Sequence, residues 1–383
     1  MSLVALALLL GCDDWPQFRG PGGRGFSAEK DLPVEWSREK GLAWTAPLPG
    51  RGLSSPVVIG DRVYLTANSG PDQERLHVLC IDAATGRLRW ERELRATGPT
   101  QCNKKTSMAA PTPAADARGV VVLFATADLP AFDPDGSLLW SRALAQDYPT
   151  YGNNVGAASS PALRDGRVYV ALENVGESYA LAVDARTGRN LWKNDRASRI
   201  AWTTPLVAGD LVVFQSPGDV TAYDAESGSR RWSLDGKFAG IPSPAEGCGV
   251  VYVPGAPALG LADGKPRWEP KGLSNATASP TMHAGRLYTL SNAGVLTCTD
   301  ARTGEAVWKE RATQGAVSAS PVIADDRIYI VNEAGVTTVL ALGDAPKKLG
   351  ENALNDTILA SPAVSNGAIY LRSDKALYCI RKP

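Results

Sequence analysis

The sequence predicts an all-β fold, an eight-bladed β-propeller whose four-stranded antiparallel blades close into one ring. Two repeated patterns predict it. A Ser-Pro or Thr-Pro dipeptide opens a short apolar strand and recurs along the chain, with successive units 36 to 55 residues apart. This spacing is typical of propeller blades rather than of helical repeats. A second frame, Asp-Ala-x-Thr-Gly-x-x-x-Trp, returns in the later half of the unit.

The first half of each unit is predicted to be a β-hairpin. Residues 56–59 (PVVI) precede turn residues at 60–61, and residues 62–65 (RVYL) follow the turn. Short apolar runs on both sides of such a turn favour two antiparallel strands. Ala110-Pro111 is taken to fill the same place in the second unit. The anchoring prolines are Pro56, Pro111, Pro161, Pro205, Pro244, Pro280, Pro321 and Pro362.

The second half of the unit predicts a tight turn followed by an outer strand. Residues 82–90 carry the full frame, and close copies occur at 184–192, 224–232 and 300–308. In this frame the Asp and Thr oxygens accept turn amides, and the glycine takes a positive φ. The tryptophan supplies a large flat face. We therefore expect each tryptophan to fill the wedge between neighbouring blades.

The last blade is predicted to be completed by the amino-terminal part of the chain. The eighth unit stops after its third strand, at Cys379, while residues 41–44 (GLAW) have the pattern of a final strand without the first three. Closure by this strand would leave no open sheet edge. The predicted division is a signal segment at 1–12, a lead segment at 13–40 and the propeller at 41–383. In the lead segment we expect a glycine-rich tether and, around Trp36, packing on the ring.

The first twelve residues predict export. Residues 3–10 are apolar but too few to span a bilayer, which needs about 20, and they suit a secretory signal. Residues 9–12 (LLGC) resemble a bacterial lipobox, in which Cys12 would become the lipidated amino terminus. No Lys or Arg precedes the apolar run, so the usual basic start is missing. The prediction is a lipoprotein on the periplasmic face of a membrane, with plain secretion as the alternative.

Composition argues against several classes of function. The 40 Lys and Arg residues balance 40 Asp and Glu residues, so no net charge attracts nucleic acid or anionic lipid. Only His77 and His283 supply imidazole, which disfavours zinc chemistry and His-dependent nucleophiles. We expect a monomer that has no nucleic-acid partner and meets the membrane only through the lipid anchor.

The repeat frame resembles the tryptophan-docking repeat of pyrroloquinoline-quinone (PQQ) enzymes and of the outer-membrane assembly lipoprotein that is an eight-bladed propeller. The lead residues 14–21 (DWPQFRGP) are similar to the opening of PQQ-binding-like propeller proteins of planctomycete-type bacteria. The resemblance covers nearly the whole chain and implies fold more specifically than activity. It implies that alcohol-oxidising members add a vicinal Cys pair, a calcium ion and a catalytic Asp. This chain has no adjacent cysteines, and Glu173 with Asn174 are its weak candidates for a cation.

A candidate binding site is predicted on the face that carries the loops between blades. The loops at 95–109 and 145–158 are longer than the others, flank the second blade and should be neighbours. Their aromatic rings, amides and Lys pair would suit a sugar, a peptide segment or a planar ring, with the lysines on a carboxylate. The alternative is that the loops plug the channel and that the Glu-Asn pair caps a hairpin turn. The candidate residues are Asn103, Lys104, Lys105, Tyr148, Tyr151, Asn153, Asn154, Glu173, Asn174 and Trp202.

Complete repeats without a convincing catalytic constellation favour a non-catalytic binding or assembly scaffold. Its partner would be an envelope protein or a small polar or carbohydrate ligand at the loop-rich face, and its edges could pair with β-segments. No catalytic residue is nominated, and this function needs no cofactor. Two alternatives stay open. One is a quinoprotein-like oxidoreductase that oxidises an alcohol or sugar with PQQ and calcium, and the other is a polysaccharide-binding module.

Overall fold

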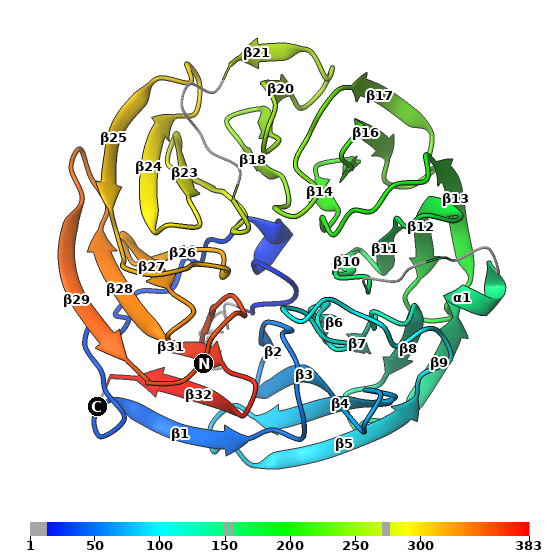
Figure 1. The fold of residues 1–383 in the computed structure, drawn as a ribbon, viewed down its shortest axis with the longest axis horizontal. Coiled ribbons are helices and arrows are strands. Elements are labelled where there is room, and N and C mark those ends of the chain that lie inside the picture. The colour runs from blue at the N-terminus through cyan, green and yellow to red at the C-terminus, as the bar shows by residue number, and fades with distance from the viewer. Residues whose placement is uncertain (1–13, 149–151, 153–155, 270–275, 383) are drawn as a thin grey trace, which may run out of the picture.

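Eight four-stranded antiparallel sheets are arranged as blades around a central channel (Figure 1). The structure is a computed structural model that describes residues 14–148, 152, 156–269 and 276–382. Each blade runs outward from a short inner strand, and the inner strands contact one another around the channel. The predicted fold class, an eight-bladed all-β propeller, is confirmed.

The first four blades follow one another from residue 57. Blade 1 contains β2 (Val57–Ile59), β3 (Arg62–Ser69), β4 (Arg75–Asp82) and β5 (Leu88–Arg95). Blade 2 contains β6 (Ala114–Asp116), β7 (Gly119–Val121), β8 (Asp128–Phe132) and β9 (Leu138–Ala143), followed by helix α1 (Leu144–Asp147). Blade 3 contains β10 (Ala162–Arg164), β11 (Arg167–Leu172), β12 (Ser178–Asp184) and β13 (Asn190–Arg196). Blade 4 contains β14 (Leu206–Ala208), β15 (Leu211–Gln215), β16 (Asp219–Asp224) and β17 (Arg230–Asp235).

The last four blades complete the ring. Blade 5 contains β18 (Ala245–Gly247), β19 (Val250–Tyr252), β20 (Ala258–Gly260) and β21 (Pro266–Trp268). Blade 6 contains β22 (Thr281–His283), β23 (Arg286–Leu290), β24 (Val295–Asp300) and β25 (Ala306–Arg311). Blade 7 contains β26 (Val322–Ala324), β27 (Arg327–Val331), β28 (Val336–Ala341) and β29 (Lys347–Ala353). Blade 8 contains β30 (Ala363–Ser365), β31 (Ala368–Arg372), β32 (Ala376–Arg381) and, as its outer strand, β1 (Leu42–Pro47).

Strand β1 closes the ring as predicted. It pairs antiparallel with β32, with Thr45 opposite Tyr378, so the first and last parts of the chain share one sheet. In Figure 1 the blue strand β1 lies beside the red strand β32. This pairing satisfies a sheet edge that the chain terminus would otherwise leave open.

One anchor of the repeat was placed wrongly from the sequence. In blade 2 the first strand, β6, begins at Ala114, so Thr112-Pro113 and not Ala110-Pro111 holds the position of the other Ser-Pro dipeptides. The N–H of Ser55 donates to the Thr112 hydroxyl at 2.9 Å, as in the other blades. The second unit therefore has the same anchor as the rest.

The tryptophans join neighbouring blades, which confirms the packing expected from the repeat. Each of seven indole N–H groups donates to a backbone carbonyl in the next blade at 2.9 to 3.3 Å. For all of these tryptophans except Trp308, the turn glycine of the next blade lies against the ring, and a Cβ on Gly228 would stand 2.5 Å from Trp192. Only glycine fits there, because φ is also +72°. The seven are Trp44, Trp90, Trp140, Trp192, Trp232, Trp268 and Trp308.

The lead segment crosses the end of the channel opposite the interblade loops. Trp15 exchanges two backbone hydrogen bonds with Val58, at 2.8 and 2.9 Å. Arg19 is fully buried, and its guanidinium donates to the carbonyl of Pro244 at 3.0 Å and to that of Pro280. The structure thus packs the glycine-rich part, with its single turn η1 (Pro21–Gly23), where the sequence suggested a tether. The reason is that glycines can approach a buried indole closely: a Cβ on Gly20 would meet Trp15.

The end of the lead segment is also held on the ring. The N–H of Trp36 donates to the Asn352 side chain at 2.7 Å, and the indole is 5% exposed.

No helix of the described residues has the length and apolar character needed to cross a membrane.

Candidate functional site

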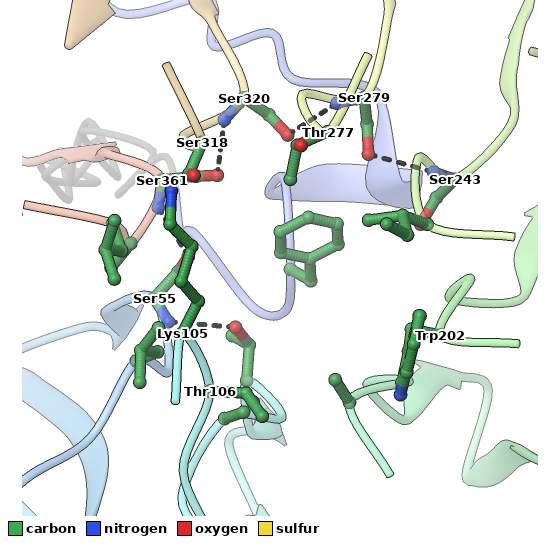
Figure 2. Close-up of a pocket in the computed structure, with 18 of the residues that line it drawn as sticks. Ser55, Lys105, Thr106, Trp202, Ser243, Thr277, Ser279, Ser318, Ser320 and Ser361 are labelled. Atoms are coloured by element: carbon green, nitrogen blue, oxygen red, sulfur yellow. Dashed lines mark hydrogen bonds between the residues drawn. The ribbon is translucent and has the colours of Figure 1, made fainter. Parts of the chain in front are cut away.

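A cavity of about 440 Å³ occupies the channel at the face where the interblade loops lie (Figure 2). This volume is within the range of about 300–1,000 Å³ that is usual for ligand pockets. Phe18 lines the cavity from the lead segment, and Leu53, Ile241 and Leu359 contribute aliphatic surface from the loops. The site therefore combines an aromatic side chain, apolar loop residues and the polar wall described next.

The wall of the cavity is a closed ring of eight hydroxyl residues. Each stands before the proline that opens a blade, and its N–H donates to the hydroxyl oxygen of the equivalent residue in the next blade at 2.8 to 3.1 Å. Figure 2 shows several of these bonds, including the one from Ser243 to Ser279. The ring closes where Ser361 donates to Ser55. Its members are Ser55, Thr112, Ser160, Thr204, Ser243, Ser279, Ser320 and Ser361.

The ring leaves hydroxyl protons for a ligand. A hydroxyl can donate one hydrogen bond and accept two, and each ring oxygen already accepts a backbone amide. Within the described part of the chain, none of the eight hydroxyls donates a hydrogen bond to a protein acceptor. The wall is therefore a circle of O–H donors, which suits a ligand rich in carbonyl or other acceptor oxygens.

The rim carries one aromatic face and one ion pair. Trp202 lines the cavity, and its indole N–H is fixed by a 2.8 Å hydrogen bond to the carbonyl of Gly156. Lys105 reaches Glu333 of blade 7, with Nζ 3.3 Å from both carboxylate oxygens, and Ser318 donates to the same carboxylate at 2.7 Å. Because the Lys105 side chain is 72% exposed, this ion pair contributes little stability and can exchange for a ligand contact.

The two long loops meet beside the cavity, as the sequence predicted. A Cβ on Gly156 would lie 3.0 Å from Cβ of Cys102, and Trp202 is bonded to the same glycine. Of the candidate ligand residues, Asn103, Lys105 and Trp202 line the cavity.

Other candidates lie elsewhere or outside the described residues. Lys104 is exposed and does not line the cavity, and its backbone carbonyl accepts from Arg51 at 2.9 Å. Tyr148 packs on Tyr179 and accepts from Asn190, away from the cavity wall, because it directly follows α1 beside the outer strands. The remaining candidates Tyr151, Asn153, Asn154 and the lipidation residue Cys12 fall outside the described residues.

Glu173 and Asn174 do not fit a calcium ion. Burial raises the pKa of Glu173 to about 7, although Arg196 contacts it at 2.5 Å, and both side chains are 2% exposed. Asn174 uses its amide within a turn, accepting from Gly152 and Gly176 and donating to the Glu177 carbonyl. Across the described ranges, no three His, Cys, Asp or Glu side chains are grouped to hold a metal. One carboxylate oxygen of Glu173 and the amide oxygen of Asn174, which would bind a cation, thus already have protein partners.

A hydrogen-bonded Ser-His-Glu chain in blade 1 was not anticipated. Ser69 Oγ lies 2.7 Å from Nε2 of His77, whose Nδ1 lies 2.7 Å from Glu91. The three residues belong to the neighbouring strands β3, β4 and β5, and none of them lines the central cavity. We assign the chain to cross-strand stabilisation, since the His77 side chain is 6% exposed and covered by its own blade.

The hydroxyl ring, which supplies most of the polar wall of the cavity, was not predicted from the sequence. The signal was visible, because a hydroxyl residue precedes the anchoring proline in every blade. It was interpreted only as a strand start. Phe18 was missed because the lead segment was expected to be partly a tether, so no residue of it was placed in the channel.

Solved structures with the same architecture include BamB proteins and dehydrogenases. BamB from Moraxella catarrhalis has a TM-score of 0.63 and 16% identity, covering 88% of this chain and 98% of that chain. A europium-containing methanol dehydrogenase has a TM-score of 0.71 and 13% identity, covering 94% of this chain and 89% of that chain. At these identities the likeness shows the fold alone.

Curated relatives also fall into both groups. The outer membrane protein assembly factor BamB of Burkholderia pseudomallei (strain K96243) is 27% identical over 145 residues, 32% of this chain and 38% of the relative. Polyvinylalcohol dehydrogenase of a Sphingopyxis species (strain 113P3) is 25% identical over 269 residues, 55% of this chain and 39% of the relative. The chain thus spans well under half the length of these two relatives.

The family match is broader than the matches to these curated relatives. Residues 17–234 and 256–348 match the model of a PQQ-repeat family described as outer membrane protein assembly factor BamB. The match covers most of the chain and includes the tryptophan frames and every residue of the hydroxyl ring except Ser243 and Ser361. The predicted resemblance to PQQ-type repeats and to the outer-membrane assembly propeller is confirmed: the chain belongs to the BamB family of PQQ-repeat propellers.

Proposed function

We propose that this protein is an exported, non-catalytic scaffold that binds an extended polypeptide segment of an envelope protein in the central cavity. The observation that carries the proposal is the ring of eight hydroxyl donors, all facing one cavity. An extended peptide has a carbonyl at every residue and exposes these acceptors when it is unpaired. Trp202, Phe18 and the aliphatic rim would receive its apolar side chains.

Family membership supports the envelope setting. The matching family model and several relatives carry the name outer membrane protein assembly factor, which we transfer here as part of the proposal. We propose a location on the periplasmic face of a membrane, with Cys12 as the lipidated residue. Replacing Cys12→Ala should abolish incorporation of a labelled fatty acid into the exported protein. Unchanged labelling would contradict the anchor.

Peptide binding tests the proposed function directly. The probe is a fluorescent ten-residue peptide with alternating apolar and polar residues, the pattern of outer-membrane β-strands. We expect Trp202→Ala to weaken binding at least tenfold by fluorescence anisotropy, because the variant removes the aromatic face of the rim. Lys104→Ala is the matched control, since Lys104 shares the loop of Lys105 but does not line the cavity. Equal affinity of the Trp202 variant and wild type would contradict a site in this cavity.

A PQQ-dependent dehydrogenase is the second candidate, because Trp202 offers a flat face beside a cavity of adequate volume. The placement of Glu173 and Asn174 argues against its calcium ion. Incubation with PQQ and calcium followed by dye-linked alcohol oxidation separates the two functions. Turnover of the alcohol would contradict the scaffold proposal and favour the dehydrogenase. In the peptide-binding assay, displacement of the peptide by a short oligosaccharide would favour carbohydrate recognition instead.

A further inference from the structure

The fully buried guanidinium of Arg372 has an edge without a protein partner. Arg372 ends strand β31 and is 1% exposed. Its Nη1 donates to both the carbonyl and the hydroxyl of Ser54, the former at 2.9 Å. Nε and Nη2 find no acceptor among the described residues. These two nitrogens form one edge of the planar group, the edge that matches a carboxylate. Leaving such donors unsatisfied in the interior is costly.

Packing does not require a charge at this position. By strand register the equivalent positions in blades 3, 6 and 7 are Ala171, Leu290 and Val331, which are buried aliphatic residues. An aliphatic side chain would therefore serve the blade equally well, at no cost of burying a charge.

Arg19 and Arg196 also leave buried nitrogens without a hydrogen bond, but their surroundings offer more acceptors than those of Arg372. Arg19 donates to the carbonyls of Pro244 and Pro280. Arg196 faces the carboxylates of Glu173 and Asp219. Among the described residues, the carboxylate whose charge acts on Arg372 is that of Asp374, which pairs with Arg51 at 3.3 Å.

A small side cavity lies at this arginine and adjoins the central one. Its volume is about 10 Å³, close to the space needed for one water-sized atom. Arg372 lines the side cavity, while Leu53, Leu359 and Ala360 line both cavities. Gly52 helps to keep the space, because a Cβ there would collide with Nη2 of Arg372.

We propose that Arg372 is an anion subsite that binds a carboxylate oxygen of a ligand held in the central cavity. The inference rests on the proposed function, because the body of the ligand occupies the hydroxyl ring. The carboxylate oxygen occupies the side cavity, and a small shift of the guanidinium, whose Nε and Nη2 are closed off from solvent here, lets it supply their missing acceptor. Burial lowers the pKa of Arg372 to about 9, as it does for the fully buried Arg19. The carboxylate can come from a peptide terminus or from an acidic side chain.

Three versions of one peptide distinguish a terminal carboxylate from an acidic side chain as the source. One has a free terminal carboxylate, the second is amidated and uncharged, and the third is amidated with a single Glu. We expect one of the two carboxylate peptides to bind wild type at least tenfold more tightly than the uncharged one by fluorescence anisotropy. The preference should disappear in Arg372→Met and persist in Lys104→Ala, since Lys104 is a nearby cation that does not line the cavity. Equal affinity for all three peptides would overturn the subsite while leaving the proposed function in place.

A second measurement tests the subsite even if Arg372→Met does not fold or none of the peptides binds. Gly52→Ala keeps the arginine but crowds its unpartnered edge. We expect acetate, at constant ionic strength, to raise the midpoint of thermal unfolding of wild type more than that of Gly52→Ala. This result with no peptide binding would support the subsite and contradict the proposed function. An equal response of both proteins would mean that the side cavity holds an ordered water only and would overturn the subsite.

Discussion

A glycine is required at each turn of the repeat frame because an indole packs directly on it and leaves no room for a Cβ. Asp82 illustrates the local chemistry, since one carboxylate oxygen accepts from the N–H groups of Ala84 and Thr85 and from the Thr85 hydroxyl. Gly86 then turns the chain with φ +71°, and its Cα lies against Trp44. Every part of the frame therefore has a contact that explains its identity. This is why the frame could be interpreted correctly from the sequence.

The contact between Gly228 and Trp192 gives a test with an internal control. Gly228→Ala should lower the free energy of unfolding through two causes, a positive φ worth about 1–2 kcal/mol and overpacking worth about 1–3 kcal/mol. Gly209→Ala has a similar φ of +60° but nothing within 4 Å of the new Cβ, so only the first cause applies. Urea unfolding measures the loss in free energy of unfolding for each of the two variants. A Gly209 variant as unstable as the Gly228 variant would contradict the docking explanation.

Strands were predictable where the repeat was complete, and contacts between distant segments were not. The closing strand β1 could be identified because its own pattern, GLAW, is a fragment of the repeat. The second anchor was misplaced because two prolines, Pro111 and Pro113, stand close together and only the hydrogen bond from Ser55 distinguishes them. The lead segment was partly misjudged, since its burial depends on Val58 and Ile323, which are remote in sequence.

The candidate site shows the same limit. Trp202, Lys105 and Asn103 were predictable from loop length and residue type, and all three line the cavity. Arg372 could not be identified, because an arginine at a strand end is ordinarily solvated and only the fold shows that it is buried.

Blades 3 and 4 are linked by a buried charge cluster whose stability depends on pH. Arg196 at the end of β13 lies between Glu173, after β11, and Asp219, at the start of β16. Burial raises the pKa of Glu173 to about 7 from its ordinary value of 4.5. Between these two values the folded state binds more protons than the unfolded state. The contribution of Glu173 to the free energy of unfolding therefore falls as pH rises through this window.

Glu173→Gln removes that pH dependence. From pH 5 to pH 8 the stability of the variant relative to wild type should rise, by at most about 3 kcal/mol at about 1.4 kcal/mol per pKa unit. Chemical denaturation at several pH values measures the change. Glu226→Gln is the control, because its side chain is 84% exposed, and it should follow the wild-type profile. A relative stability of Glu173→Gln that is constant with pH would contradict the assignment.

At the scale of the whole molecule, closure of the ring and closure of the channel create the site. The eight anchors meet only because β1 completes blade 8, which places Ser361 next to Ser55. The lead segment crosses the opposite end, where Arg19 bonds to carbonyls directly after Ser243 and Ser279. The result is a cup, meaning a channel that is closed at one end by the lead segment and open at the end with the interblade loops. With no net charge on the chain, recognition would depend on shape and hydrogen bonding within this cup.

The outer strands present a competing surface for an extended peptide, because their edges could pair with a β-segment. Leu88 on β5 is 54% exposed on this outer surface, and Ile241 at the mouth of the cavity is 45% exposed. The two residues are matched in size and exposure and differ in location.

Photocrosslinking from these two positions tests the central claim most directly. Benzoylphenylalanine is placed at residue 241 or at residue 88, and each protein is irradiated with the ten-residue alternating peptide. A site in the cup predicts a crosslink from position 241 that excess unlabelled peptide suppresses, and none from position 88. A crosslink from position 88 with none from position 241 would contradict the account.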